Sequence, residues 1–246
     1  MAPEGEIIVG VLGQWSSGKS TAAKTLVGHL GGEGEVVFIN DAVLFASQAI
    51  NHIRELDCQV VVSTEDDGRR RLAGKYARVW LGPGEELTTV SLSTLHFDVD
   101  DEVMPAWLNK ARLELGYQIC ERCADGKPIV IEAGFGKNPT DHTISDLFVA
   151  LGEAGVTLDR VKWIIVEADF NTRSERNDRR GFGPPPAIFA RYAADGGDLD
   201  PDHQRRLEEQ GAMIRRVAND HDNIQRFRAD IIAAYEELFI GGSGDS

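Results

Sequence analysis

Cysteine is scarce in this chain, and the few cysteines form no disulfide pattern. Only 3 of the 246 residues are cysteines, an odd and small number that suits a reducing compartment rather than a disulfide-stabilised scaffold. Cys120 and Cys123 form a C-x-x-C, but no second C-x-x-C and no H-x-x-x-H pair is present to supply the further ligands of a zinc site. We therefore interpret the pair as small residues one turn apart on a helix, with metal or redox chemistry as the alternative.

Basic residues are also in short supply. The chain has 26 Lys and Arg against 40 Asp and Glu, which gives a formal net charge of -14. Such a charge opposes extended contact with nucleic acid or an anionic membrane, so we expect neither as a partner. Any anionic ligand must then be bound in a local basic pocket.

Long apolar segments are missing as well. No run approaches the roughly 20 apolar residues of a membrane-spanning helix, and residues 1–6 contain neither the basic nor the apolar region of a secretion signal. We therefore expect a cytoplasmic protein. The length fits one large α/β domain, which we place at residues 1–240, with a flexible Gly- and Ser-rich tail at 241–246.

Apolar runs of strand length alternate along the chain with segments of helical period. The runs are continuous, as in parallel strands that are covered on both faces. Strands that alternate with helices indicate a mostly parallel sheet with helices on both sides. The core strands predicted in this way are Ile7–Leu12, Val36–Ile39, Ile129–Ile131 and Val161–Val166.

The pattern changes between the second and third of these strands. Residues 57–100 contain short strand-like runs separated by turn signals such as Gly82-Pro83-Gly84, and we expect a β-rich insertion that binds the substrate. The strands predicted within the insertion are Gln59–Ser63, Tyr76–Leu81 and Leu87–Leu95.

The C-terminal part of the chain is predicted to hold two helices and a short fifth strand. The predicted elements are a long helix at His203–Asn219, the strand at Asn223–Phe227 and a final helix at Ala229–Phe239.

The most informative motif follows the first core strand. Residues 13–21 read Gly-Gln-Trp-Ser-Ser-Gly-Lys-Ser-Thr and fill every fixed position of the phosphate-binding pattern G-x-x-x-x-G-K-[ST]. In such a loop the backbone amides face a polyphosphate, Lys19 reaches the β- and γ-phosphates, and the Ser20 hydroxyl coordinates Mg²⁺. A helical period follows, and a helix N-terminus favours an anion; an ordinary glycine-rich turn is the alternative. The predicted nucleotide-binding residues are Gly13, Trp15, Ser16, Ser17, Gly18, Lys19, Ser20 and Thr21.

Acidic residues stand at the ends of three of the four core strands. Ligands of open parallel sheets bind beyond the carboxyl ends of the strands, so these residues are candidates for chemistry. Asp41 follows the second strand and is expected to act as general base or orienter of an acceptor hydroxyl, with a helix N-cap as the alternative. Glu132 in the third strand is expected to hold the magnesium shell or the substrate, with a turn carboxylate as the alternative. Glu167 and Asp169 end the fourth strand.

Together these features resemble the P-loop kinases of the nucleoside/nucleotide kinase type, within the P-loop NTPase superfamily. The phosphate loop comes early, Asp41 ends the second strand, the third strand ends in Ile131-Glu132-Ala133-Gly134, and arginines follow the fourth strand. The resemblance implies a three-layer α/β sandwich and a lid, which we place at residues 170–202. Arg173, Arg176 and Arg180 would share one helical face and close over the γ-phosphate; a solvated charged helix is the alternative.

The resemblance also implies an activity, namely an ATP- and Mg²⁺-dependent phosphotransferase. Its partner would be a small-molecule acceptor such as a nucleoside, nucleotide, sugar or cofactor precursor. Asp41, Glu132, His96 and Arg70 are the predicted acceptor residues, and for the last two a solvated surface position is the alternative. A nucleotide hydrolase or switch protein is the competing function, although its commonest sequence motifs are missing. A homodimer is one option for assembly.

Overall fold

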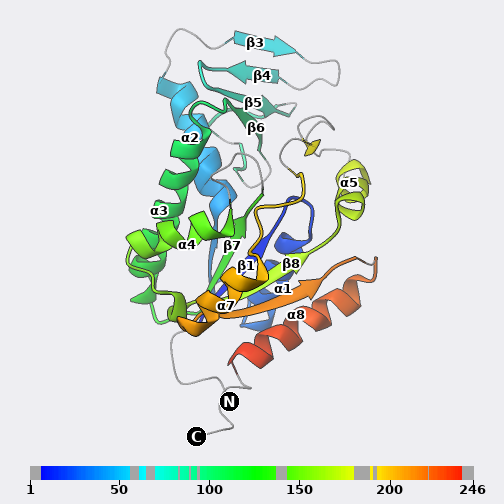
Figure 1. Cartoon of the computed structure of the whole chain (residues 1–246). Coiled ribbons are helices and arrows are strands. Elements are labelled where there is room, and N and C mark those ends of the chain that lie inside the picture. Colours follow the sequence, from blue (N-terminus) through cyan, green and yellow to red (C-terminus); the bar gives the residue numbers. More distant parts are fainter. Residues whose placement is uncertain are drawn as a thin grey trace, which may run out of the picture.

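The computed structural model describes residues 7–55, 61–64, 70–82, 84–88, 90–92, 95–136, 143–179, 189–190, 193–220 and 222–239. Two sheets organise this part of the chain, one of five strands and one of four (Figure 1). The tail predicted at 241–246 lies outside the described residues, as do parts of the predicted insertion and lid. No helix in the described ranges combines the length and the apolar character that a membrane span requires.

The larger sheet is parallel throughout, as the sequence predicts. Its strands lie in the order β2-β7-β1-β8-β9, and each hydrogen-bonded pair is parallel. All six residues of the central strand β1 are buried, because neighbouring strands and covering helices surround it. The strands are β1 (Ile8–Gly13), β2 (Val37–Asn40), β7 (Ile129–Gly134), β8 (Lys162–Glu167) and β9 (Met213–Ala218).

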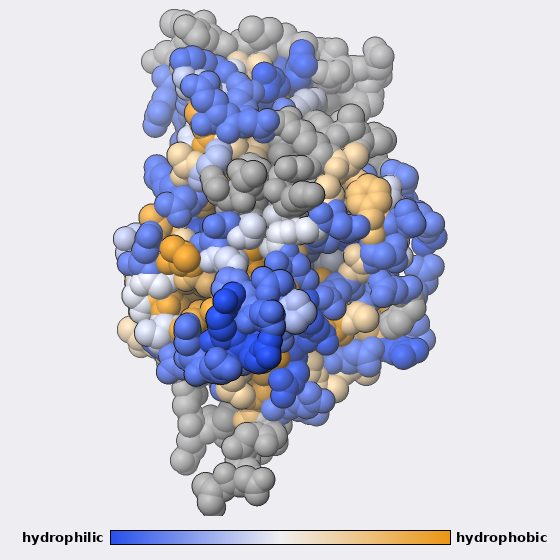
Figure 2. All heavy atoms as spheres, in the orientation of Figure 1, coloured by the Kyte–Doolittle hydropathy of each residue, from blue (hydrophilic) through white to orange (hydrophobic). Residues whose placement is uncertain are grey.

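Helices cover both faces of this sheet and give the predicted three layers (Figure 1). Successive side chains of a strand point to opposite faces, and Ile8 and Leu12 accordingly join one core while Val9 and Val11 join the other. On the first face lie α3 (Met104–Cys123), α4 (Ile144–Glu153) and α7 (Pro201–Glu209), and on the second lie α1 (Lys19–His29) and α8 (Ile224–Phe239). Figure 2 shows one side of the molecule, where the most hydrophilic residues gather around α7.

The smaller sheet is antiparallel and confirms the β-rich insertion after the second core strand. Its strands pair in sequence order, β3 (Val61–Thr64), β4 (Arg70–Ala73), β5 (Ala77–Leu81) and β6 (His96–Val99). A separate hydrophobic core joins it to α2 (Asp41–Glu55) and to the start of α3. The smaller sheet therefore lies beyond the end of the larger sheet at which β2 ends and α2 begins (Figure 1).

One predicted strand of the insertion is wrong, and one strand was not predicted. Among the described residues of the range 87–95 there is no strand, and the strand begins instead at His96. Arg70 and Arg71 lie in β4, the strand that was not predicted, which buries only Leu72. A strand with a single buried side chain shows no clear alternation, and its pairing with β3 and β5 depends on non-local hydrogen bonds.

The prediction for the C-terminal region is also corrected. The long helix at His203–Asn219 is wrong, because α7 ends at Glu209 and β9 follows at Met213. The strand predicted at Asn223–Phe227 is wrong too, since α8 begins at Ile224. The two buried side chains of β9, Ile214 and Val217, are three positions apart, and this spacing imitates one turn of a helix.

The last elements precede and follow β8. A single 3₁₀ turn, η1 (Leu158–Arg160), leads into the strand, and α5 (Phe170–Arg179) follows it. Helix α5 opens the predicted lid region, so the register of its arginines decides which of them face the sheet edge.

Candidate active site

The predicted phosphate loop connects the buried strand β1 to the N-terminus of α1. Gly13 ends the strand and Lys19 begins the helix. Gly18 has a φ of 106°, and a Cβ at this position would lie 2.3 Å from Asn219 Nδ2, so only glycine fits. Ser16 also has a positive φ, 62°, which is uncommon for a residue with a side chain and marks a constrained turn.

This turn contains two buried hydroxyl groups, those of Ser16 and Ser17. Ser16 is 4% exposed and Ser17 is fully buried, and within the described part of the chain neither Oγ atom has a hydrogen-bond partner. Buried polar groups without a partner are rare in native structures. The first amides of α1 are also free of any side-chain cap at Gly18, and helix N-terminal amides bind anions readily. The loop therefore fits a polyphosphate, as its sequence predicts.

Asn219 contacts the loop from the end of the edge strand of the larger sheet, β9. It follows β9, is 6% exposed, and donates from Nδ2 to the Ser17 carbonyl oxygen at 2.7 Å. Arg176 of α5 donates to the same carbonyl at 3.4 Å and to Asn219 Oδ1 at 3.4 Å. Sequence reasoning missed Asn219 because β9 was not recognised; its position directly after a core strand would otherwise have marked it.

Ser20 and Glu132 lie in contact. Ser20 Oγ donates to Glu132 Oε1 at 2.5 Å, and Asn40 Nδ2 donates to Glu132 Oε2 at 3.1 Å. The structure thus brings together the two predicted magnesium ligands. Their oxygen atoms suit Mg²⁺, which is usually bound by one or two carboxylates and keeps several waters. Among the described residues no group of three or more His, Cys, Asp and Glu side chains gathers around a common point.

Asp41 is the first residue of α2 and is almost fully buried. Its Oδ2 atom accepts a hydrogen bond from the Gly134 amide at 2.7 Å. Burial raises the pKa of the Asp41 carboxyl from 3.8 to about 6, although the Gly134 amide and the charges of Lys19 and Arg112 oppose the rise. A carboxyl with this pKa is a base near neutral pH that accepts a proton more readily than an ordinary aspartate.

The side chain that caps the N-terminus of α2 is that of Asn40, not that of Asp41. Asn40 Oδ1 accepts a hydrogen bond from the Ala42 amide at 2.8 Å, which is the bond that a capping side chain makes. The Asp41 carboxylate is directed to Gly134 at the end of β7 instead.

The predicted role of Arg173 is corrected. Its side chain is fully buried and donates to the carbonyl oxygens of Ala168 and Ala193 at 3.0 and 2.7 Å and to Asp195 Oδ1 at 2.5 Å. Burial lowers the pKa of its guanidinium. Arg173 therefore faces the protein interior, since the helical face it was expected to share with Arg176 packs inward at this position. Arg180 lies outside the described residues.

A pocket of about 260 Å³ adjoins the phosphate loop. Arginine side chains line one part of it, and residues that follow β9 line another. The lining residues are Ser16, Gly18, Thr21, Arg176, Arg179, Asn219, Asp222 and Ile224. A pocket with two guanidinium groups beside a phosphate loop suits a bound nucleotide. A second, wider pocket of about 440 Å³ lies beside α7 and Arg216, apart from these groups.

The predicted site residues that are left to place are Arg70, His96 and Trp15. Arg70 of β4 donates to the Glu85 carbonyl oxygen and pairs with Glu86 at 3.3 Å, so its described contacts stay within the insertion. His96 begins β6 and pairs in register with Trp80 of β5, and its side chain is outside what the structure describes. The ring of Trp15 packs against Phe189, with 6.4 Å between ring centroids. The structure thus does not bring Arg70 to the phosphate loop.

Comparisons with known proteins support the fold. No protein-family profile matches the sequence, and no curated protein was found that is similar to it in sequence. An unliganded sugar kinase of Janibacter sp. HTCC2649 is similar in structure over 98% of this chain and 100% of that chain, with a TM-score of 0.50 and 12% sequence identity. This likeness covers nearly all of both chains, and the three-layer α/β fold that the resemblance implies is confirmed.

Two further solved structures are more distant. A shikimate kinase from Acinetobacter baumannii in complex with shikimate has a TM-score of 0.48 and 12% identity, covering 98% of this chain and 97% of that chain. A thymidylate kinase from Ehrlichia chaffeensis has a TM-score of 0.45 and 14% identity, covering 94% of this chain and 99% of that chain.

Proposed function

We propose that this protein is an ATP- and Mg²⁺-dependent phosphotransferase that moves the γ-phosphate to a hydroxyl of a small-molecule acceptor. The observation that carries the proposal is the place of the buried Asp41 carboxyl, which accepts a hydrogen bond at 2.7 Å from Gly134, the residue in register with Gly13 of the phosphate loop. Burial also raises the pKa of this carboxyl to about 6. A protein that only binds a nucleotide has no need of a base at this place, whereas transfer to a hydroxyl does.

The phosphate loop supplies most of the electrostatic stabilisation in this proposal. Lys19 contacts the β- and γ-phosphates, and the amides at the start of α1 bind the phosphate oxygens. Ser20 and Glu132 would hold Mg²⁺, and the ion would neutralise charge on the phosphate oxygens. Arg176, 3.4 Å from the Ser17 carbonyl, provides a further positive charge near the transferred group.

Asp41 acts on the acceptor. Its carboxylate accepts the proton of the acceptor hydroxyl as the hydroxyl oxygen forms a bond to the γ-phosphorus. The bond between that phosphorus and the β–γ bridging oxygen breaks, and ADP leaves with both electrons of that bond. The Gly134 amide, which donates to Asp41 Oδ2, fixes the carboxylate so that the other oxygen can face the acceptor.

The acceptor is expected between α2, α3 and the insertion. Arg112 of α3 is buried, donates to the Thr143 carbonyl oxygen at 3.3 Å, and its charge reaches Asp41. A cytoplasmic location is part of this proposal and is supported by the low cysteine content, which suits a reducing compartment. The homodimer stays a prediction.

The proposal is tested by screening a panel of small metabolites for ATP-dependent phosphorylation, with ATP hydrolysis in the absence of any acceptor as the control. Release of ADP that depends on an acceptor supports the kinase, whereas equal release without acceptor favours the hydrolase or switch protein. Lys19→Ala should abolish most ATP binding, because the lysine contacts two phosphates. Lys24→Ala is the matched control, since Lys24 lies exposed on the same helix. Wild-type ATP binding and turnover in the Lys19 variant would contradict the assignment.

A further inference from the structure

The segment of residues 193–200 forms the last part of the predicted lid region before α7, and side chains from separate elements hold it. We call this segment the strap. Arg173 of α5 binds its beginning through the Ala193 carbonyl oxygen at 2.7 Å and Asp195 at 2.5 Å. Because Arg173 is fully buried, the beginning of the strap cannot move without breaking bonds of a buried charged group, which is costly.

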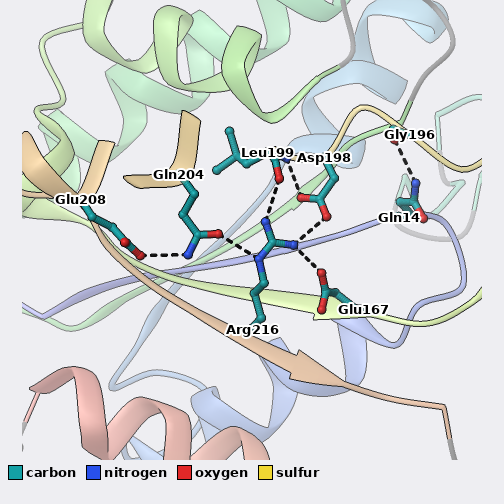
Figure 3. Close-up of polar contacts among 8 residues, drawn as sticks. All are labelled: Gln14, Glu167, Gly196, Asp198, Leu199, Gln204, Glu208 and Arg216. Atoms are coloured by element: carbon teal, nitrogen blue, oxygen red, sulfur yellow. Dashed lines mark hydrogen bonds and ion pairs between the residues drawn. The ribbon is translucent and has the colours of Figure 1, made fainter. Parts of the chain in front are cut away.

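Arg216 of β9 holds the other end of the strap (Figure 3). It donates to Asp198 Oδ2 at 2.7 Å and to the Leu199 carbonyl oxygen at 3.0 Å, and it also pairs with Glu167 at the end of β8. Its Nε atom donates to Gln204 Oε1 at 2.9 Å. Every nitrogen of the guanidinium therefore contacts the protein itself, so Arg216 anchors the strap to the sheet.

The middle of the strap touches the phosphate loop. Gln14, the second residue of the motif, donates from Nε2 to the Gly196 carbonyl oxygen at 3.0 Å (Figure 3). The next residue, Gly197, has a φ of 77°, and a Cβ there would lie 1.9 Å from the carbonyl oxygen of Gly136, just beyond β7. Gly197 also accepts a hydrogen bond from the Ile144 amide at 3.0 Å. The strap thus contacts both the phosphate loop, at Gln14, and the residues that follow β7, at Gly136.

Trp15 makes a second contact between the phosphate loop and the lid region. Trp15 follows Gln14 and packs on Phe189, which in turn contacts Phe170 at the start of α5, with 5.9 Å between ring centroids. Phe189 is 2% exposed. Gln14 and Trp15 occupy positions that the phosphate-binding pattern leaves unspecified, and in this chain both contact residues of the predicted lid region, Gly196 and Phe189.

We propose that Gln14 is a positioning residue for the triphosphate, acting through the strap that Arg173 and Arg216 hold in place. The Gln14–Gly196 hydrogen bond fixes the phosphate loop in the conformation that binds the ligand, so residues that never touch the nucleotide contribute to its affinity. This inference rests on the proposed function, because it requires that the loop bind Mg·ATP.

The experiment is calorimetric titration of the full-length protein with Mg·ATP. Wild type, Gln14→Met, Arg216→Met and the double variant are compared at a temperature well below each melting point. Loss of one hydrogen bond predicts an affinity about 3- to 10-fold weaker in Gln14→Met. The double variant should bind no more weakly than Arg216→Met alone, because two changes that break the same connection are not additive. Gln118→Met and Arg205→Met, in surface pairs with Glu114 and Asp202, are matched controls expected to bind as wild type does.

The outcomes separate the two proposals. If wild type itself fails to bind Mg·ATP, the proposed function fails and the inference falls with it. If wild type binds and Gln14→Met binds equally well, only the inference is overturned. Effects of Gln14→Met and Arg216→Met that add in full also overturn it, since they would act independently. Gln14→Glu, which keeps the side-chain length but cannot donate when ionised, must show the same loss; a lower melting temperature with unchanged affinity would indicate a purely structural role and contradict the proposal.

Discussion

Asp41 Oδ2 accepts a hydrogen bond from the Gly134 amide at 2.7 Å, which joins the first residue of α2 to the last residue of β7. Because β7 pairs with β1 and Gly134 is in register with Gly13, this bond also places the carboxyl beside the start of the phosphate loop. One oxygen of a buried carboxyl is thereby fixed by the backbone. The arrangement suits a base that must present its second oxygen in a defined direction.

Asp41→Asn should retain nucleotide binding and lower phosphoryl transfer by about two to four decades, which is the usual contribution of a general base. The amide keeps an oxygen that can accept from Gly134, so the local structure is preserved. The measurement is the steady-state turnover with an acceptor found by the metabolite screen, alongside calorimetric ATP affinity. Unchanged turnover would return Asp41 to a structural role at the start of α2.

The raised pKa of Asp41 also predicts a pH-dependent stability. The folded protein binds the Asp41 proton more tightly than the unfolded chain, because the pKa rises from 3.8 to about 6. The stability contributed by protonation is therefore fully present below about pH 3.8 and is lost as the pH rises through about 6. Asn at this position resembles the protonated form, so Asp41→Asn should be more stable than wild type at pH 8, by about 3 kcal/mol for a shift of about two pKa units.

Urea denaturation of wild type and Asp41→Asn at pH 4 and pH 8 measures this difference. The advantage of the variant should be largest at pH 8 and close to zero at pH 4. Asp202→Asn, at an exposed position on α7, serves as the control for the loss of one carboxylate. An equal difference at both pH values would show that burial does not raise the pKa of Asp41.

The sequence was sufficient wherever the signal was local. The phosphate loop is nine consecutive residues, and the strands β1, β2, β7 and β8 are continuous apolar runs, so their order predicted a parallel sheet with Asp41 and Glu132 at one edge. Ser20 was predicted as a magnesium ligand from the loop motif, and Glu132 from its place at the end of a core strand, where ligands of parallel sheets bind. Their contact at 2.5 Å is what that reasoning leads one to expect.

Non-local contacts explain what the sequence did not reveal. Strand β9 has buried residues at helical spacing, Ile214 and Val217, and it exists because β8 offers a free edge. Once β9 was misread as helix, Asn219 could not be recognised as the residue that binds Ser17. The spacing of Arg173 and Arg176 correctly indicated a helix, but only the packing of α5 decides which guanidinium is buried.

Arg176→Ala should depress turnover more than ATP affinity. Its guanidinium lies beside the phosphate loop, 3.4 Å from the Ser17 carbonyl, where a positive charge stabilises the transition state more than the bound substrate. We expect turnover about 100-fold lower, the order of magnitude for losing one donor to a developing charge. Turnover and calorimetric ATP affinity are compared with those of Arg226→Ala, which removes an exposed arginine paired with Asp230 on α8. The lid assignment of Arg176 fails if only the melting temperature changes.

Arg173→Met should act on stability rather than on chemistry. The substitution keeps most of the buried volume but removes all donors to the carbonyl oxygens of Ala168 and Ala193 and to Asp195. The Ala193 carbonyl is the buried acceptor among these, and leaving it without its donor costs about 1–3 kcal/mol, so the free energy of unfolding should fall by about that amount. Denaturation in urea measures the loss, and Arg226→Met, in an exposed pair with Asp230 on α8, is the control for removing a surface arginine. Unchanged stability together with lost turnover would instead mean that Arg173 leaves its buried position and reaches the transferred phosphate, as its place in the sequence first predicted.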